Sequence, residues 1–147
     1  MREVCARYGI NRAQRAAHEL LQYSEELMRA FLLRVPRGTY RAEDFLDNDG
    51  ITDKPVKIAV EVNVRSGRPR HIVTVDFTGS DPQVEGSVNA VKAITYSACF
   101  YVFRCLLADD APAATGLMRP IRVIAPEGTV VNARPPAAVA EIGRAHV

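Results

Sequence analysis

Cysteine is scarce in this sequence, which has three, at Cys5, Cys99 and Cys105, and no C-x-x-C spacing. An odd number of cysteines without regular spacing does not form the disulfide framework of a small secreted domain. The N-terminus also lacks the apolar core of a signal peptide. These absences predict a protein of the reducing cytoplasm.

An excess of either charge is also missing. Nineteen Lys and Arg residues stand against seventeen Asp and Glu, which gives a net charge of +2 spread along the chain. Proteins that bind nucleic acids or membrane surfaces concentrate basic residues on one stretch or face. We therefore expect protein or small-molecule partners, with no nucleic acid and no membrane. A length of 147 residues with 48% hydrophobic content is enough for one ordinary domain with a real core.

The familiar catalytic motifs are absent as well. The sequence contains no G-x-S-x-G elbow, no Walker phosphate loop and no H-E-x-x-H metal motif. His18 and His71 have no second ligand at metal-site spacing, and we interpret both as structural. No catalytic residue and no metal ligand is therefore named from the sequence.

The last seven residues, 141–147, are excluded from the fold. Residues 142–147 read Ile-Gly-Arg-Ala-His-Val, which is one reading frame of a common sequencing adapter. We treat this tail as adapter read-through rather than natural protein, as with other sequence scars. His146 is therefore not counted as a ligand or a base.

The pattern of apolar residues predicts the secondary structure. Apolar residues three and four apart indicate an amphipathic helix over 11–35, capped by Asn11 and ended by Pro36. Alternation predicts strands at 56–64 and 73–77. We also expect short strands at 39–46 and, in two pieces, within 119–131. Residues 90–107 are apolar almost all round, which is typical of a buried helix.

This order of elements indicates the α+β class. We expect an antiparallel sheet with an amphipathic N-terminal helix and a buried central helix, as part of a larger subunit.

The candidate site is the loop between the third strand and the central helix. It gathers polar side chains and glycines where a helix N-terminus offers free N–H groups, and glycine permits close approach of backbone to a ligand. We predict that it contacts substrate or phosphate. The alternative is a structural loop that Asp76 caps and in which Asn89 starts the helix. The predicted contact residues are Asp76, Thr78, Gly79, Ser80, Gln83, Gly86 and Asn89.

Several linked motifs resemble the hydantoinase B/5-oxoprolinase family in order and spacing. The resemblance covers nearly all of residues 2–140. The motifs are Gly38-Thr39-Tyr40, Asp44, Asp49-Gly50, Val75 to Ser80, Pro82-Gln83-Val84, Gly86, Asn89, Arg104 to Leu107, Arg119-Pro120-Ile121, Ala125 to Thr129, Asn132 and Arg134 to Val139.

The resemblance implies that residues 1–140 are a middle segment of a B-type subunit. Such subunits, with an ATP-using hydantoinase A-type partner, hydrolyse cyclic amides such as 5-oxoproline or N-methylhydantoin in a hetero-oligomer. It also implies ATP with Mg²⁺ at the partner and a divalent metal bound N-terminal to this segment, with neither bound by the segment itself. We therefore expect this fragment to be inactive alone.

Two other functions remain open. Related complexes carboxylate ketones such as acetone or acetophenone, and the resemblance does not separate this reaction from ring hydrolysis. The third possibility is a non-catalytic interaction module that docks on a larger subunit.

Overall fold

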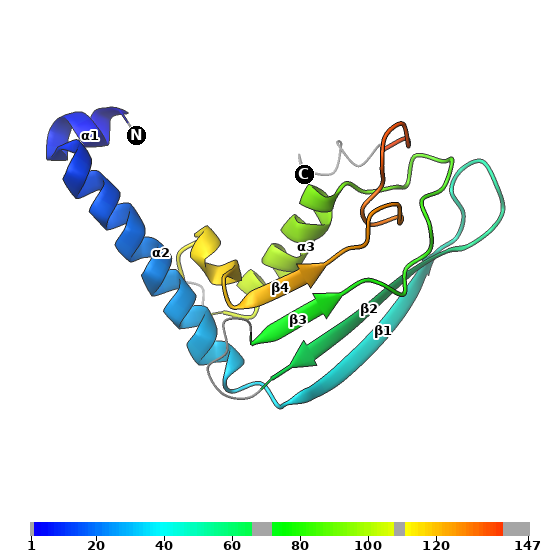
Figure 1. The fold of residues 1–147 in the computed structure, drawn as a ribbon, viewed down its shortest axis with the longest axis horizontal. Helices are drawn as coiled ribbons and strands as arrows, with labels where there is room; N and C mark the ends of the chain where they lie inside the picture. The colour runs from blue at the N-terminus through cyan, green and yellow to red at the C-terminus, as the bar shows by residue number, and fades with distance from the viewer. Residues whose placement is uncertain (1, 66–71, 108–110, 140–147) are drawn as a thin grey trace.

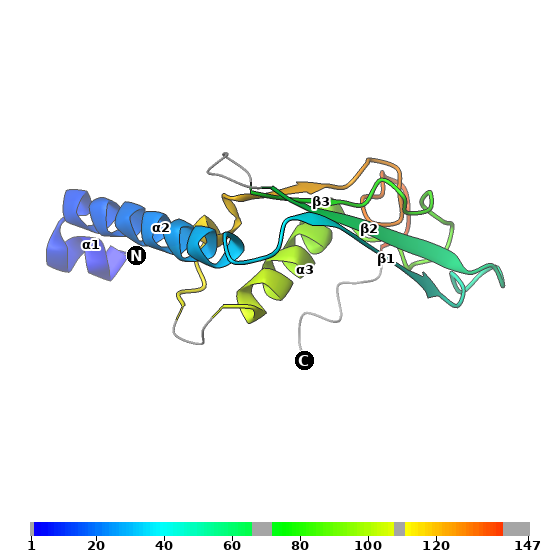
Figure 2. The ribbon, with the colours of Figure 1, turned by 90° about the horizontal axis from the view of Figure 1, so that it is seen from below.

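The computed structural model describes residues 2–65, 72–107 and 111–139, and shows a four-stranded sheet with a helix across one face and a long helical arm beside it (Figure 1). Seen from below, helix α3 lies against one side of the sheet and the other side is open (Figure 2). This is the α+β arrangement that the sequence predicts. Residues 66–71, which include His71, and the tail at 141–147 lie outside the described residues.

The arm consists of α1 (Arg2–Tyr8) and α2 (Ile10–Leu32), which meet at Gly9. Gly9 has φ of 79°, a left-handed conformation that glycine adopts readily, and this breaks the helix between Tyr8 and Ile10. The prediction that Asn11 caps the long helix is therefore wrong. Gly9 is the N-cap, without a side-chain cap hydrogen bond, because a backbone reversal at glycine and not a side-chain bond sets the start of the helix.

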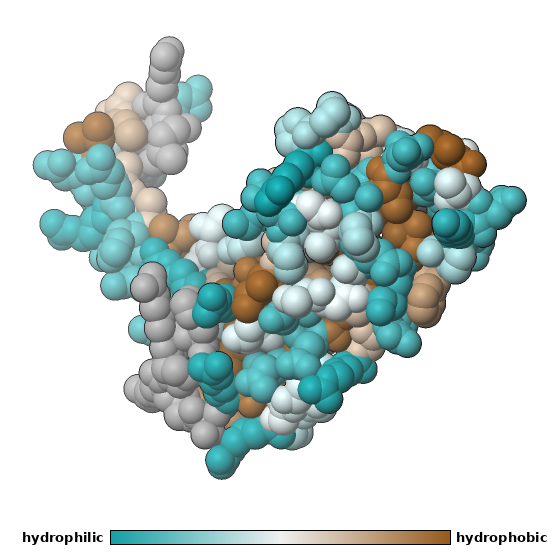
Figure 3. Space-filling model, turned by 45° about the vertical axis from the view of Figure 1, so that its right-hand side comes forward, coloured by the Kyte–Doolittle hydropathy of each residue, from teal (hydrophilic) through white to brown (hydrophobic). Residues whose placement is uncertain are grey.

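Only the C-terminal half of α2, from about Leu21, packs against the body of the chain. Its buried residues are Ser24, Met28 and Leu32, while the N-terminal part stands clear of the body (Figures 1 and 3). Glu25 and Arg29, four residues apart on α2, form an ion pair at 2.8 Å, and Arg119 adds a second ion pair to Glu25 at 3.2 Å.

The sheet has the order β1 (Gly38–Leu46), β2 (Val56–Val64), β3 (Val73–Asp76), β4 (Ile121–Ile124). The first two pairings are antiparallel and β3 pairs with β4 in parallel. The sheet is thus mostly antiparallel, and the parallel pair follows from the crossover through α3. The second strand predicted within 119–131 does not form. Thr129 instead makes isolated bridges to Pro82 and Asn132.

Helix α3 (Lys92–Cys105) and the 3₁₀ helix η1 (Thr115–Met118) complete the body. The main core joins the end of α2, the apolar face of the sheet, α3 and η1; its buried members are Met28, Leu32, Val64, Ile72, Val73, Val75, Cys99, Leu117, Met118 and Ile121. Within this chain α3 is less buried than the apolar sequence predicts, since its buried residues are Thr95 and Cys99. Its other side is exposed.

The 3₁₀ helix η1 packs very closely against α2. A Cβ added at Gly116 would lie 2.1 Å from the carbonyl oxygen of Leu21 and 2.2 Å from Ser24 Oγ. Real Cβ atoms do not approach other atoms so closely, and one of the neighbours is rigid helix backbone. Glycine at 116 is therefore required for η1 to reach the buried end of α2.

We expect Gly116→Ala to lower the free energy of unfolding by about 1–3 kcal/mol, because overpacking forces the backbone apart. Urea denaturation of the 147-residue chain measures the effect. Thr115→Ala, at an exposed position of the same turn, is the control and should change stability by less than about 0.5 kcal/mol. Equal stability of wild type and Gly116→Ala would contradict the tight contact.

Candidate functional site

The open face of the sheet carries a row of charged side chains across three strands. Arg41 on β1 is in register with Glu61 on β2, and Glu61 is in register with Asp76 at the end of β3. Residues directly opposite one another in neighbouring strands lie on the same face. Asp76 therefore leaves the sheet on the side away from the apolar face.

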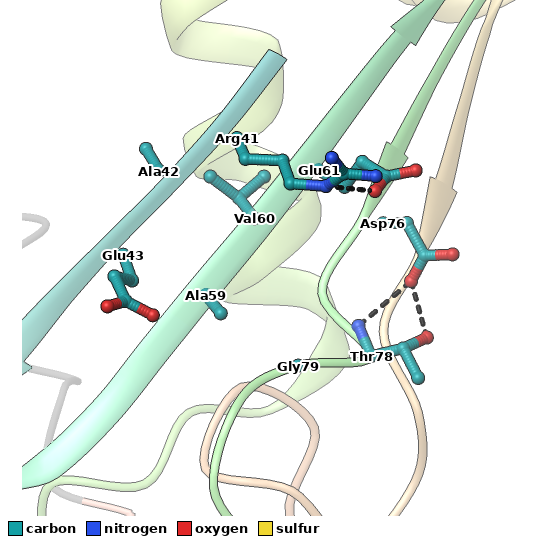
Figure 4. Close-up of a pocket in the computed structure, with 9 residues that line it drawn as sticks. All are labelled: Arg41, Ala42, Glu43, Ala59, Val60, Glu61, Asp76, Thr78 and Gly79. Atoms are coloured by element: carbon teal, nitrogen blue, oxygen red, sulfur yellow. Dashed lines mark hydrogen bonds and ion pairs between the residues drawn. The ribbon is translucent and has the colours of Figure 1, made fainter. Parts of the chain in front are cut away.

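These side chains line a cavity of about 420 Å³ (Figure 4). Its walls come from β1, from β2 and from the loop after β3. Of the predicted contact residues, Asp76, Thr78 and Gly79 line it. The complete lining is Arg41, Ala42, Glu43, Ala59, Val60, Glu61, Asp76, Thr78 and Gly79.

The loop starts with a tight turn that Asp76 stabilises. Asp76 Oδ1 accepts a hydrogen bond from the backbone N–H of Thr78 at 2.8 Å, and the hydroxyl of Thr78 donates to the same oxygen (Figure 4). Aspartate commonly bonds the backbone two residues further on in this way. Asp76 thus has the capping role that was the alternative interpretation of the sequence. The same side chain also lines the cavity.

An ion pair lies further along the same face. Arg41 Nε donates to Glu61 Oε2 at 2.8 Å, and the two side chains are 75% and 42% exposed (Figure 4). An exposed pair of this kind contributes only about 0–1 kcal/mol. An anionic ligand can therefore draw the guanidinium of Arg41 away from Glu61 at small cost. The cavity offers this cation beside the carboxylates of Glu43, Glu61 and Asp76.

Asp49, in the turn between β1 and β2, holds the middle of the loop. It is 4% exposed, and its carboxylate accepts backbone N–H bonds from Thr52 at 2.6 Å, Ile51 at 3.0 Å and Gly86 at 3.2 Å. These bonds stabilise the charged form, with Thr52 the largest contributor, and lower the pKa of Asp49 to about 2. A Cβ at Gly86 would lie 1.7 Å from the Asp49 carbonyl oxygen. Gly86 thus serves the packing of the loop.

Asn89 holds the end of the loop and is 0% exposed. Its Oδ1 accepts the N–H of Val84 at 2.9 Å. Its Nδ2 donates to the carbonyl oxygens of Val84 and Gly86, both at 2.8 Å, and to that of Ala138 at 2.9 Å. The side chain therefore joins the loop to the segment near residue 138.

Ser80 and Gln83 connect the loop to its neighbours. Ser80 Oγ accepts from the N–H of Ala59 and donates to its carbonyl oxygen, both at 3.1 Å. Gln83 Oε1 accepts the N–H of Arg134 at 2.8 Å. These two contacts fix the loop against β2 on one side and against the C-terminal segment on the other.

The predicted contact residues therefore divide into those that line the cavity and those that shape the loop behind it. Sequence reasoning missed Arg41, Glu43 and Glu61, because they lie on strands whose pairing register cannot be deduced from the sequence. The alternation along 56–64 was the one available signal, since it places Glu61 on the polar face.

Comparison with known proteins identifies the family. The family described as hydantoinase B/oxoprolinase matches residues 1–146. This chain belongs to the hydantoinase B/oxoprolinase family. The B-type subunit of a D-/L-hydantoinase of Pseudomonas sp. (strain NS671) is 37% identical over 137 residues, and the 5-oxoprolinase of Saccharomyces cerevisiae is 35% identical over 100 residues.

The chain spans a small part of those relatives. The matches include 88% and 68% of the chain, but 23% of the Pseudomonas protein and 7% of the yeast protein. The ATP-dependent caprolactamase from Pseudomonas jessenii has the same fold, with a TM-score of 0.75 and 29% identity over 93% of this chain and 23% of that one. A nucleotide-free acetone carboxylase structure matches with a TM-score of 0.79 over 94% of this chain and 19% of that one. Its 20% identity shows the fold alone.

The divalent metal implied by the family resemblance is expected N-terminal to this segment, outside the residues described here. Within 2–65, 72–107 and 111–139, no three His, Cys, Asp or Glu side chains are grouped so that they could hold a metal ion. Over the same residues, no helix is long and apolar enough to cross a membrane.

We expect Asp49→Asn to destabilise the chain near neutral pH and to lose this effect in acid. The folded pKa of about 2 lies below the ordinary value of 3.8. The contribution of the carboxylate is therefore fully present above about pH 4 and is lost as the pH falls toward about 2. Urea denaturation of wild type and variant at about pH 6 and about pH 3 measures the difference.

Asp53→Asn, an exposed carboxylate of the same turn, is the matched control. It should change the free energy of unfolding by less than about 0.5 kcal/mol. A destabilisation by Asp49→Asn that is as large at low pH as at neutral pH would show that its carboxylate charge does not hold the turn.

Proposed function

We propose that this chain is part of the B-type subunit of an ATP-dependent enzyme that opens cyclic amides such as 5-oxoproline or N-methylhydantoin. The observation that carries the proposal is the family match over residues 1–146, together with 37% identity to the B-type subunit of a hydantoinase. The caprolactamase, whose name gives it ATP dependence, supports the same class of reaction at 29% identity. The lactam ring it is named for is a cyclic amide.

A cyclic amide is a poor electrophile, which explains the need for ATP. In this proposal ATP with Mg²⁺ belongs to a hydantoinase A-type partner and supplies the activation of the amide. The residues of the present chain bind and orient the ring. We place the complex in the cytoplasm, because three cysteines without regular spacing form no disulfide framework.

The cavity on the open face of the sheet is the proposed contact with substrate or phosphate. Its volume of about 420 Å³ is in the usual range of small-molecule sites. The planar guanidinium of Arg41 suits a carboxylate or a phosphoryl group. Thr78 and Asp76 offer a hydroxyl and a carboxylate within one turn of the loop, where they can bond the polar edge of a ring.

Ketone carboxylation is the second candidate. Its support is the acetone carboxylase fold, whose 20% identity does not extend to the reaction. A non-catalytic interaction module is the third, and it is supported by the small share of the relatives that the chain spans.

The reaction is tested with the complete subunit and its A-type partner. We expect ADP release that depends on 5-oxoproline or N-methylhydantoin, with the opened amino acid as the second product. ADP release that requires acetone and bicarbonate instead would replace ring opening by carboxylation. A complex that assembles but releases no ADP with any of these compounds would favour the interaction module.

The cavity is tested by Asp76→Asn in the same complex. An asparagine oxygen can still accept the Thr78 N–H, so we expect a small change in melting temperature but a loss of turnover of about tenfold or more, since the charge is removed from the ligand site. Steady-state kinetics and thermal unfolding of the same preparation give both values.

Asp44→Asn is the matched control. The Asp44 carboxylate also accepts a backbone N–H, from Phe45 at 2.9 Å, but Asp44 is exposed and does not line the cavity. Turnover should be unchanged in this variant. Wild-type turnover in Asp76→Asn, or an equal loss in both variants, would remove the cavity from the proposal.

A further inference from the structure

Helix α3 presents an apolar stripe to solvent on the side away from the sheet. Ile94, Ala98, Tyr101 and Cys105 recur at intervals of four, three and four residues, and all four are exposed. We refer to these four residues as the α3 seam. Tyr101 is 70% exposed, and Val102 beside it is 55% exposed. This spacing is that of a helix packed against a second helix.

The C-terminal end of the seam leads into an apolar groove. Leu106, next to Cys105, lines a hollow of about 720 Å³ between the end of α3 and the exposed side of α2. The groove also includes Tyr23 and Leu27 of α2 and Pro36 after it, with Arg34 as its one charged lining residue. The seam and the groove are thus neighbouring surfaces at the end of α3, and neither shares a lining residue with the cavity on the polar face of the sheet. Contiguous exposed apolar surfaces mark sites of protein contact.

We propose that the α3 seam and the adjoining groove are the docking surface for another part of the same subunit polypeptide. The lengths of the relatives support this occupant. The matched fold occupies 23% of the caprolactamase chain and the matched sequence 23% of the Pseudomonas hydantoinase polypeptide, so each of these polypeptides carries a large further portion tethered to this unit. The seam has no charged residue, which is typical of permanent rather than transient contacts.

A second copy of the chain fits this surface less well. Helix α3 carries two cations, Lys92 and Arg104, near its two ends and no acidic residue. In a two-fold pairing of antiparallel helices, the positively charged Lys92 end of one copy lies beside the positively charged Arg104 end of the other. Like charges at such positions oppose the pairing. A different surface of the same polypeptide has no such restriction.

The native cysteines provide the test. Cys105 belongs to the seam and is exposed, whereas Cys99 is buried in the core. Burial also raises the pKa of Cys99 to about 11, which leaves little reactive thiolate near neutral pH. In a Cys5→Ser background, the rate of maleimide labelling at Cys105 reports whether the seam is covered. Labelling at Cys99 reports whether the chain is folded.

We expect Cys105 to react rapidly in the 147-residue chain and at least about tenfold more slowly in the complete subunit. Cys99 should be protected in both. Equal rates at Cys105 would overturn the proposal. Protection of Cys105 in the 147-residue chain that increases with protein concentration would assign the surface to a second copy instead.

Tyr101→Lys in the complete subunit is the second arm, with Ile51→Lys as its control. Both residues are large, apolar and more than 60% exposed in this chain, but Ile51 lies in the turn after β1. Tyr101→Lys should restore rapid labelling of Cys105 while Cys99 remains protected, and Ile51→Lys should not. Slow labelling of Cys105 in the folded Tyr101→Lys variant would contradict docking at the seam. Because the readout is labelling and not turnover, this result is independent of the reaction that the enzyme catalyses.

Discussion

The buried amide of Asn89 is the interaction on which the site depends. Residues 77–91 form no helix or strand, so their backbone polar groups need partners from elsewhere. The Asn89 side chain hydrogen-bonds the N–H and the carbonyl oxygen of Val84, and also the carbonyl oxygens of Gly86 and Ala138. The carboxylate of Asp49 accepts a further hydrogen bond, from the N–H of Gly86. The loop thus keeps one conformation although it has no regular structure, and Asp76 and Thr78 at its start are held at the edge of the sheet.

The two faces of the sheet carry different kinds of side chain. Alternation along β2 places Val60, Val62 and Val64 toward α3 and the core, and Glu61 and Asn63 toward the open side. The same pleat that buries the valines thus lines up Arg41, Glu61 and Asp76 on the other face. A cavity on that face requires no gap in the core, which explains how a small α+β unit carries polar groups without loss of packing.

Local patterns predicted most of the elements. The alternation at 56–64 and 73–77 and the three-to-four spacing within 11–35 are set by side-chain burial over a few residues, and the structure confirms these elements as β2, β3 and α2, with ends that differ by one to three residues for β3 and α2. The start of α2 and the absence of a strand at 129–131 were not predicted. The first is determined by the backbone conformation of Gly9, and the second by bonds from the 129–132 segment to the loop at 81–83, such as that from the Val130 N–H to the Asp81 carbonyl oxygen.

The sequence by itself determined the family, the α+β class and the loop as a polar segment between a strand and a helix, because these depend on residue types at fixed spacing. Only the tertiary structure decided which polar residues face a cavity. Asp76 and Asn89 are similar in type and both lie near the loop, yet one lines the open face and the other is completely buried. The register of β2 and β3 places Asp76 on the open face, and the packing of residues 49 and 138 against the loop buries Asn89. Both depend on contacts between residues far apart in the sequence, which no local pattern encodes.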